Sequence, residues 1–228
     1  MNILAIDTSN DVLGIAIVKS GIVTGEYVTN IKKNHSIRLM PAIDQLMMDT
    51  QTKPEDLSRI AVAHGPGSYT GVRIGLTTAK TMAWALDIPV IGISSLEALA
   101  SQGRLFSGLI CPFFDARRGL VYTGLYDSQM NHVKKETNML MTDWLDSLHD
   151  LDQPILFLSQ DLELHKEVIK ETLGKHAVFP GAAYHYARPS YLALAASERE
   201  PSFIHDLIPN YLRIPEAEAK WLAEQENK

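Results

Sequence analysis

The chain has a single cysteine among its 228 residues, and this scarcity excludes a fold held together by disulfides. The one thiol, Cys111, suits a reducing cytosol. The sequence also contains no apolar run of the roughly 18 residues that a membrane-spanning helix needs, and it starts with a strand-like segment rather than a cationic leader. These absences predict a soluble, cytoplasmic protein with no membrane partner.

An excess of positive charge is missing as well. The chain carries 21 Lys and Arg against 27 Asp and Glu, for a formal net charge of −6. The longest basic runs are the pairs Lys32-Lys33 and Arg117-Arg118. A free-standing nucleic-acid binder needs clustered Lys and Arg to neutralise phosphates, so this class is excluded. With 46% apolar and 21% charged residues, the chain is an ordinary globular protein of one large domain or two small ones.

The common catalytic patterns are also missing. No two of the eight histidines stand three or four residues apart, so the sequence predicts no metal site. No Gly-x-Ser-x-Gly motif is present. Cys111 lies in an apolar run directly before Pro112, where a thiol is usually buried and inert. The sequence therefore predicts no catalytic residue.

A glycine-rich stretch at residues 64–75 is the most distinctive segment that the chain does have. It follows the apolar run 60–63 and opens a helical pattern that continues to Leu86. Backbone N–H groups in such a strand–turn–helix can converge on an anion. A phosphate loop would need a Lys before a Ser or Thr after its last glycine, whereas Val72-Arg73 follow Gly71 and Lys80 is too distant. A tight turn, with Ser68 or Thr70 as helix cap, is favoured over a phosphate cradle.

The helix after this turn has a face almost without side chains. Gly71, Gly75, Ala79 and Ala83 recur at intervals of four. Glycine inside a helix costs up to about 1 kcal/mol relative to alanine, so close approach of another element is expected here. The pattern alone slightly favours an internal packing partner over another subunit.

The two halves of the chain repeat one order of elements. The first half reads β-β-β-α-β-α-β-α as far as Gly103, and the second half restarts near Gly108. Strands are expected at 2–6, 13–18, 22–29, 60–63, 88–93, 108–114, 120–126, 131–137, 155–158 and 178–179. Helices are expected at 36–50 (with Pro41 as a kink or in the first turn), 70–86, 96–102, around 144–145, and at 162–173, 190–199 and 215–223. Such a duplication predicts two similar lobes with a cleft between them.

Each half begins with a strand that ends in an aspartate, Asp7 or Asp115. The turn Asp7-Thr8-Ser9 either bonds its own backbone or presents N–H and hydroxyl groups to a phosphate. If the lobes face each other, the two aspartates could hold a magnesium–nucleotide through water. Structural turn aspartates are the favoured interpretation.

The sequence resembles the bacterial TsaB (YeaZ) family, in its Gram-positive form. The segments that carry the resemblance are residues 3–9, 65–75 with 79–80, 114–122, 210–213 and 217–221. The resemblance implies an α/β, duplicated actin/Hsp70-like (ASKHA) fold whose two lobes each contain a mixed sheet flanked by helices. It also implies an N-terminal lobe at 1–103, a C-terminal lobe at 104–214, and a helix at 215–228 that packs back on the first lobe.

The resemblance further implies a non-catalytic subunit of the complex that forms N6-threonylcarbamoyladenosine beside the anticodon of tRNAs. Its implied partner is the catalytic paralogue TsaD, which carries a metal-binding His-x-x-x-His motif that this sequence lacks. A small ATPase, TsaE, joins them, and TsaC supplies threonylcarbamoyl-adenylate. No cofactor of its own is expected, because ATP and a divalent metal belong to the partner subunits. tRNA is reached only through the complex, and a homodimer is expected when TsaD is absent.

The implied partner interface lies on the helices at 36–50 and 70–86, and this raises the partner interpretation of the small-residue face above internal packing. Its residues are Ile37, Met40, Ile43, Met47, Tyr69, Thr70, Gly71, Arg73, Gly75, Leu76, Ala79, Met82 and Ala83. A vestigial phosphate or nucleotide turn would comprise Asp7, Thr8, Ser9, Gly65, Gly67, Asp115, Arg117 and Arg118. The alternatives are a small-molecule kinase-like ATPase of the same fold and a peptidase.

Overall fold

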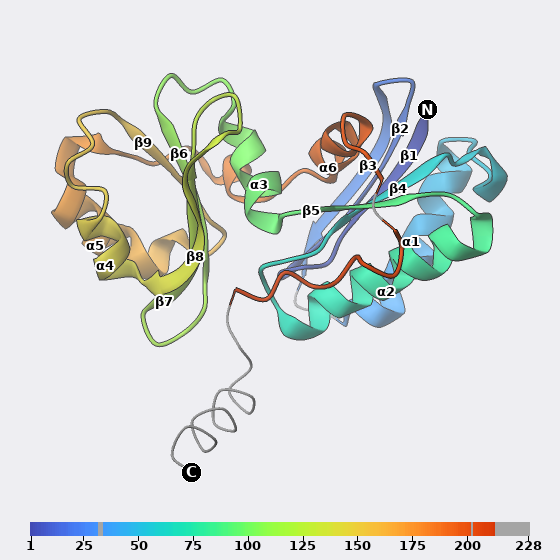
Figure 1. Ribbon diagram of the computed structural model, residues 1–228, viewed down its shortest axis with the longest axis horizontal. Coiled ribbons are helices and arrows are strands. Elements are labelled where there is room, and N and C mark those ends of the chain that lie inside the picture. Colours follow the sequence, from blue (N-terminus) through green and yellow to red (C-terminus); the bar gives the residue numbers. More distant parts are fainter. Residues whose placement is uncertain (32–33, 202, 213–228) are drawn as a thin grey trace, which may run out of the picture.

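We describe the chain from a computed structural model, which covers residues 1–31, 34–201 and 203–212 (Figure 1). The helix expected at 215–228 and the pair Lys32-Lys33 lie outside the described residues. Two sheets stand side by side, each with its own helices, so the predicted two-lobe arrangement is present. None of the helices in the described part is long and apolar enough to cross a membrane.

The first lobe is built on a five-stranded sheet in the order β3-β2-β1-β4-β5. Its strands are β1 (Asn2–Asp7), β2 (Val12–Lys19), β3 (Ile22–Asn30), β4 (Arg59–Ala63) and β5 (Val90–Ile93). The hairpin strands β1, β2 and β3 pair antiparallel, whereas β1, β4 and β5 run parallel. β1 and β2 are buried along nearly their whole length, which explains why their sequences read as continuous apolar runs rather than alternating ones.

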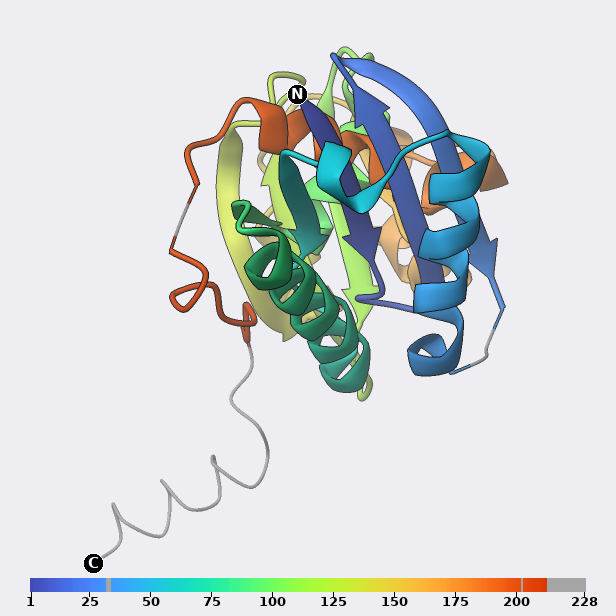
Figure 2. The ribbon, with the colours of Figure 1, turned by 90° about the vertical axis from the view of Figure 1, so that its right-hand side faces the viewer.

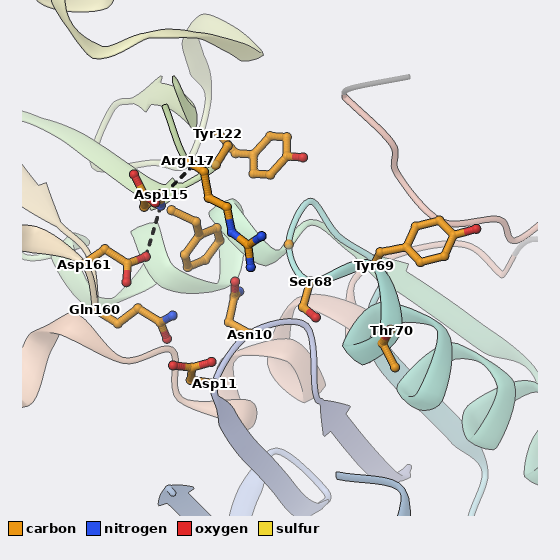
Figure 3. Close-up of a pocket in the computed structure, with 13 residues that line it drawn as sticks. Asn10, Asp11, Ser68, Tyr69, Thr70, Asp115, Arg117, Tyr122, Gln160 and Asp161 are labelled. Carbon is orange, nitrogen blue, oxygen red and sulfur yellow. Dashed lines mark hydrogen bonds between the residues drawn. The ribbon is translucent and has the colours of Figure 1, made fainter. Parts of the chain in front are cut away.

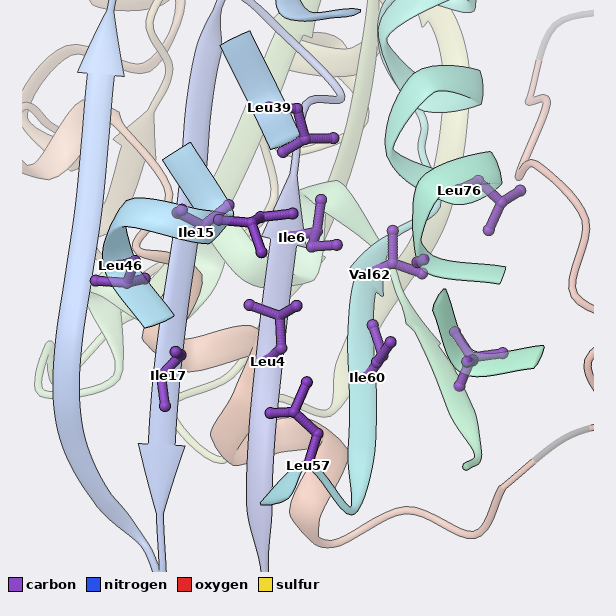
Figure 4. Close-up of a cluster of buried hydrophobic side chains, with 14 of the residues drawn as sticks. Leu4, Ile6, Ile15, Ile17, Leu39, Leu46, Leu57, Ile60, Val62 and Leu76 are labelled. Carbon is purple, nitrogen blue, oxygen red and sulfur yellow. The ribbon is translucent and has the colours of Figure 1, made fainter. Parts of the chain in front are cut away.

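Two long helices cover one face of this sheet, α1 (His35–Asp49) and α2 (Tyr69–Leu86) (Figure 2). The core beneath them joins aliphatic side chains of both helices to those of β1, β2 and β4 (Figure 4). Ser68 caps α2 by accepting a hydrogen bond from the Gly71 N–H at 3.3 Å, which confirms one of the two expected caps. Pro41 lies inside α1 rather than in its first turn.

The second lobe repeats this topology. Its sheet has the order β10-β9-β6-β7-β8, which is the order of the first sheet with each strand replaced by its counterpart. The strands are β6 (Leu109–Asp115), β7 (Leu120–Tyr126), β8 (His132–Leu140), β9 (Ile155–Leu158) and β10 (Ala177–Val178). Helices α4 (Met141–Asp146) and α5 (Leu162–Leu173) pack on one face of it. The predicted duplication is therefore confirmed. Single-turn 3₁₀ helices occur at Pro54–Asp56, Ser101–Gly103, Gly174–His176 and Ala182–His185.

Each half supplies one helix to the other half. α3 (Ser95–Ala100) precedes the expected boundary at Gly103, yet Leu96 and Leu99 pack among apolar residues of the second sheet. α6 (Pro189–Ser197) belongs to the second half, yet Leu192 and Ala193 pack on the first sheet, on the face opposite α1 and α2. The expected boundary separates the two sheets, whereas these helices cross it in both directions.

A final described segment, residues 203–212, runs back along α2 and β5, and we call it the strap (Figure 1). Lys80 Nζ donates to the Leu207 carbonyl at 2.9 Å, and the Asn210 N–H donates to the His64 carbonyl at 2.8 Å. The Asn210 side chain also donates to Glu136 of the second lobe at 3.2 Å. The strap therefore ties the glycine-rich turn to the second lobe.

Candidate functional site

A cleft of about 610 Å³ lies between the lobes, at the ends of strands β1 and β6, beside the first turn of α2 (Figure 3). Ligands of open α/β sheets bind at this position, outside the carboxyl ends of the strands. The lining residues are Asn10, Asp11, Gly67, Ser68, Tyr69, Thr70, Phe114, Asp115, Ala116, Arg117, Tyr122, Gln160 and Asp161.

The glycine-rich turn is fastened to the turn that follows β1. The Ser68 N–H donates to the Ser9 carbonyl at 2.7 Å. A Cβ on Gly67 would come within 2.1 Å of the same carbonyl oxygen, so only glycine fits there. Because the Ser68 and Gly71 N–H groups are already bonded, the stretch forms the tight turn that the sequence favoured, with fewer donors left for an anion.

The polar groups of the turn Asp7-Thr8-Ser9 are also hydrogen-bonded within the chain. Oδ1 of Asp7 accepts from the Ser9 N–H at 2.9 Å and from the Ser9 hydroxyl at 2.7 Å. The Thr8 hydroxyl donates to the Gly71 carbonyl at 2.8 Å. Burial raises the pKa of Asp7 above its ordinary value, and the bonds from Ser9 offset only part of that effect. The Ser9 hydroxyl therefore serves the turn itself, and the Thr8 hydroxyl joins the turn to α2.

Asp115 anchors the corresponding turn of the second lobe. Its Oδ1 lies 3.0 Å from His165 Nε2, and its Oδ2 accepts from the Arg117 N–H at 3.1 Å. Arg117 and Arg118 both have left-handed backbones, with φ of 67° and 56°. Two adjacent non-glycine residues in this region store strain of the kind found at functional sites. The turn aims the Arg117 side chain toward Asn10, across the cleft (Figure 3).

Asp161 completes the acidic wall on this side. Its Oδ2 accepts from the Asp115 N–H at 3.0 Å. Burial raises the pKa of Asp161, and the nearby charges of Asp115 and Asp11 raise it further. Three carboxylates, Asp11, Asp115 and Asp161, thus line one cleft.

The vestigial turn expected from the sequence is only partly gathered at the cleft. Gly67, Asp115 and Arg117 line it, and Asp7 lines an adjoining recess. Thr8, Ser9, Gly65 and Arg118 are not among the lining residues of either space. The sequence interpretation missed Asn10, Asp11, Tyr122, Gln160 and Asp161. A signal for the last two existed, because they follow β9 as the glycine-rich turn follows its counterpart β4.

The structure corrects part of the interface prediction. Seven of its residues are buried against the first lobe's own core or backbone, so a partner cannot reach them. They are Ile43, Met47, Gly71, Gly75, Leu76, Ala79 and Ala83. A Cβ on Gly75 would come within 2.5 Å of the Thr8 hydroxyl, which shows that the small-residue face is needed for close packing of α2 on β1. The internal interpretation of this face is the right one, and Met82 is half-buried.

Five of the remaining interface residues are exposed: Ile37, Met40, Tyr69, Thr70 and Arg73. Ile37, Met40 and Thr70 belong to a larger surface of mostly uncharged residues, with the exposed Asp44 one turn from both Met40 and Met48, and we call this surface the α1–α2 ridge. It comprises Ile37, Met40 and Met48 on α1, and Thr70, Thr77, Thr81 and Trp84 on α2. Arg73 is the one charged residue among the exposed residues of α2. Its guanidinium lies 3.7 Å from the centre of the Tyr69 ring, and Tyr69 stacks on Tyr211 of the strap. A surface helix normally carries charge on its outer face.

No described group of three or more His, Cys, Asp or Glu side chains is arranged to hold a metal ion. Cys111 is fully buried, and burial raises the pKa of its thiol to about 11. Its sulfur accepts a hydrogen bond from Trp144 Nε1 at 3.3 Å. A thiol in this state is a poor nucleophile.

Comparison with known proteins gives consistent matches over the whole chain. The family model described as "TsaD: tRNA N6-adenosine threonylcarbamoyltransferase" matches residues 23–221. The tRNA threonylcarbamoyladenosine biosynthesis protein TsaB of Bacillus subtilis is 54% identical over 228 residues, covering 99% of this chain and 100% of that protein. TsaB of Escherichia coli is 32% identical over 135 residues, which is 58% of each chain.

A solved structure with the same fold comes from Pseudomonas aeruginosa, where it is described as an uncharacterized protein with similarity to the peptidase YeaZ. It superposes with a TM-score of 0.77 at 23% identity, covering 93% of this chain and 99% of that one. At this identity the likeness concerns the fold alone. The predicted duplicated actin/Hsp70-like α/β fold, with a mixed sheet and flanking helices in each lobe, is confirmed.

Proposed function

The chain belongs to the TsaB family, whose Bacillus subtilis member is a tRNA threonylcarbamoyladenosine biosynthesis protein, and from this premise we propose that it acts in that biosynthesis as a non-catalytic partner subunit. The subunit it supports is the catalytic paralogue TsaD. It reaches tRNA only within that complex, in the cytoplasm. ATP and the divalent metal belong to the partner subunits, among them the ATPase TsaE.

The α1–α2 ridge is the observation that carries this proposal. Ile37 is 70% exposed and Trp84 is 72% exposed, on helices whose inner faces are already packed. The centre of a protein interface is depleted of charge and enriched in aromatic residues and methionine. The ridge has this composition, since methionine, threonine and tryptophan replace the lysine and glutamate expected on a solvated helix.

The Tyr69–Arg73–Tyr211 stack extends the ridge at the amino-terminal end of α2. Arg73 Nε donates to the Tyr211 hydroxyl at 2.8 Å, so three partly exposed side chains are held in fixed positions before any partner arrives. Tyr and Arg dominate the residues whose truncation costs most in interfaces. Pre-ordered side chains also lower the entropy lost on association. The stack therefore supports a docking role for this end of the helix.

The chemistry around the ridge supports a non-catalytic role. The one thiol is buried, the Ser9 hydroxyl is bonded to Asp7 of its own turn, and the Thr8 hydroxyl is bonded to the Gly71 carbonyl of α2. The reactive groups for the transfer would then come from TsaD. In the absence of TsaD, the same ridge is expected to pair with a second copy of the chain.

Size-exclusion chromatography with light scattering, on the chain alone and mixed with TsaD from the same organism, tests the proposal. A one-to-one complex is expected. Ile37→Arg places a charge on the ridge, and its matched control is Leu164→Arg on α5, where the replaced side chain is also 70% exposed. Ile37→Arg should weaken the complex by about tenfold or more, a typical loss at an interface centre, while Leu164→Arg leaves it unchanged.

Two results would overturn the proposal. The first is the absence of a complex under every nucleotide condition. The second is equal binding of TsaD by Ile37→Arg and by the unaltered chain, which would remove the ridge from the interface. Circular dichroism of each variant verifies that both arginine substitutions leave the chain folded, as expected for exposed positions.

A further inference from the structure

Tyr211, the strap residue of the aromatic stack on α2, is held on both sides by the second lobe. Its neighbour Asn210 donates from its side-chain nitrogen to Oε2 of Glu136 on β8, at 3.2 Å. Its other neighbour, Leu212, is partly buried in an apolar cluster built from α3 and the second sheet. The Tyr211 ring nevertheless lies on the first lobe, where it stacks on Tyr69 with the ring centres 5.6 Å apart. The stack therefore depends on both lobes.

Glu136 reaches the strap from β8 and joins three separate segments. Its Oε1 accepts from the hydroxyl of Tyr126 on β7 at 2.5 Å and from the hydroxyl of Ser94, the N-cap residue of α3. Burial raises the pKa of Tyr126, and the charge of Glu136 raises it further, so the phenol keeps its proton and donates. A side-chain network whose members are all bonded is rigid. The three donors thus hold the carboxylate in one orientation.

The local backbone aims Glu136 toward the strap. The register of β7 on β8 changes so that one β7 residue, Gly124, stands opposite two β8 residues, Lys135 and Glu136. This is a β-bulge, a device that redirects a side chain beside a functional site. A Cβ on Gly124 would lie 3.3 Å from Cγ of Glu136, so the missing side chain leaves room for the glutamate stem.

The order of Tyr211 matters for docking because the other members of the stack depend on it. Arg73 Nε donates to the Tyr211 hydroxyl at 2.8 Å, and Tyr211 itself is 40% exposed. Side chains that are mobile before association lose entropy when a partner immobilises them, which lowers affinity by about two- to tenfold for each. A strap that left Tyr211 mobile would release Arg73 as well. Whatever fixes the strap therefore raises the affinity of the stack.

We propose that Glu136 is a positioning residue for partner docking. From the second lobe it fixes Asn210, and through Asn210 it orders Tyr211 in the stack before TsaD arrives. The affinity of the first lobe for TsaD then depends on the fit between the two lobes. Coupling of this kind is reciprocal, so TsaD bound to the stack in turn holds the lobes together. The inference rests on the proposed function and adds to it the contact that regulates the docking surface.

The affinity for TsaD, measured by isothermal titration calorimetry, tests the proposal. Glu136→Ala and Asn210→Ala should each weaken binding by at least about fivefold, because two side chains of the stack lose their order. Glu136→Gln should bind within about twofold of the unaltered chain, since its amide keeps an oxygen for Asn210 and can donate to the hydroxyl oxygens. The matched control is Glu171→Ala, which removes the same charge from an exposed position on α5 and should change nothing.

A double variant separates positioning from a general loss of stability. Tyr211→Ala alone should weaken binding by about tenfold or more, as for an aromatic residue at an interface. Adding Glu136→Ala to it should weaken binding by less than about a further twofold, the usual error of additivity, because the side chain that Glu136 positions is already gone. A residue that only stabilised the fold would cost the same factor in both backgrounds.

Nuclear magnetic resonance of the free chain gives a second readout that does not need TsaD. The Nε–H of Arg73 donates to the Tyr211 hydroxyl, so it should exchange slowly with water in the unaltered chain. Exchange should become faster in Glu136→Ala and in Asn210→Ala, and stay slow in Glu171→Ala. Arg73→Lys identifies the resonance. Asn210→Ala carries the test if Glu136→Ala fails to fold, because it leaves the backbone N–H bonded to His64.

Three results would overturn the inference. The first is equal binding of TsaD by Glu136→Ala, Asn210→Ala and the unaltered chain, which leaves the proposed function intact if Ile37→Arg still weakens the complex. The second is an equal loss from Glu136→Ala with and without the Tyr211 side chain. The third is unchanged exchange at the Arg73 Nε–H, which would remove the positioning role alone. Absence of any complex with TsaD would overturn both the inference and the proposed function.

Discussion

The second helix of each lobe occupies the same place in a duplicated topology, yet α2 and α5 have opposite surfaces. The exposed residues of α5 are Glu163, Leu164, Glu167, Lys170 and Glu171, of which four are charged. The exposed residues of α2 are Tyr69, Thr70, Arg73, Thr77, Thr81, Trp84 and Ala85, of which one is charged. The same fold position therefore carries a helix with a mostly charged outer face in one lobe and a helix with one exposed charge, Arg73, in the other.

The inner faces of the two helices differ as well. α5 packs through Leu162, Ile169 and Leu173, which fill the space above the second sheet. α2 packs through Val72 and Leu76, but the other buried residues of its inner face are glycine and alanine, so its backbone lies close to the end of β1 and to Thr8. The comparison teaches that the fold itself requires neither surface. The inner face of α2 is specialised for close packing, and its outer face is the one that we propose for a partner.

Ala79→Arg tests the inner face of α2 most severely. Ala79 is fully buried against the first sheet, so the guanidinium would be buried without a partner. The expected loss in the free energy of unfolding exceeds about 4 kcal/mol. Urea denaturation measures it, with Thr77→Arg on the outer face as the control that should change stability by less than about 0.5 kcal/mol. Similar stabilities for the two variants would contradict the assigned helix orientation.

The two lobes offer a matched pair of tryptophans. Trp144 on α4 is 3% exposed and packs in the second core, whereas Trp84 on α2 is 72% exposed. Trp144→Ala is expected to destabilise the chain by about 3–5 kcal/mol, and Trp84→Ala by less than about 0.5 kcal/mol. Thermal unfolding compares them. Association with TsaD should respond in the opposite order, and a Trp84→Ala chain with unimpaired association would weaken the contrast between the lobes.

Glu136 joins the lobes, and its removal should loosen the strap. Oε1 accepts from the Ser94 and Tyr126 hydroxyls, and Oε2 accepts from Asn210. Glu136→Ala leaves these donors unsatisfied, at a cost of about 2–3 kcal/mol. Hydrogen exchange should become faster at the Asn210 amide, which donates to His64. Lys135→Ala, an exposed neighbour on the same strand, is the control, and equal exchange in both would mean that the strap does not depend on Glu136.

Asp7→Asn should produce the smallest change, and it should be a gain at neutral pH. Burial raises the folded-state pKa of Asp7, so the folded chain holds a proton more tightly than the unfolded chain. Stability is therefore lost as the pH rises from the unfolded value of 3.8 through the raised folded value. Asparagine keeps the oxygen that accepts from Ser9 and removes this loss. The variant's advantage in denaturation midpoint should disappear at low pH, and an advantage independent of pH would refute the assignment.

The order of elements was predictable from the sequence because most strands are apolar runs bounded by turn residues, with β3 and β8 as the polar exceptions. The packing partners were not. The spacing of Gly71, Gly75, Ala79 and Ala83 reveals a flat face but not its direction, and the interface prediction placed that face outward. The exchange of α3 and α6 leaves no local signal, because an apolar helix packs equally well on either sheet. Asp161 follows β9 as the glycine-rich turn follows β4, but its place beside Asp11 could not be predicted, because only the fold brings the two together.

The crossing of α3 and α6 has a consequence for how the chain can be divided. A fragment that ends near Gly103 would keep all five strands of the first sheet and lose the helix that covers Ala5 and Ala16. An uncovered apolar face of that size favours association. Two copies of a single half could bury it only by exchanging their third helices, as in a domain-swapped dimer. In the duplicated protein the two halves exchange helices as in such a dimer, but within one chain. Because each lobe depends on a helix from the other half, the protein should unfold in a single cooperative step.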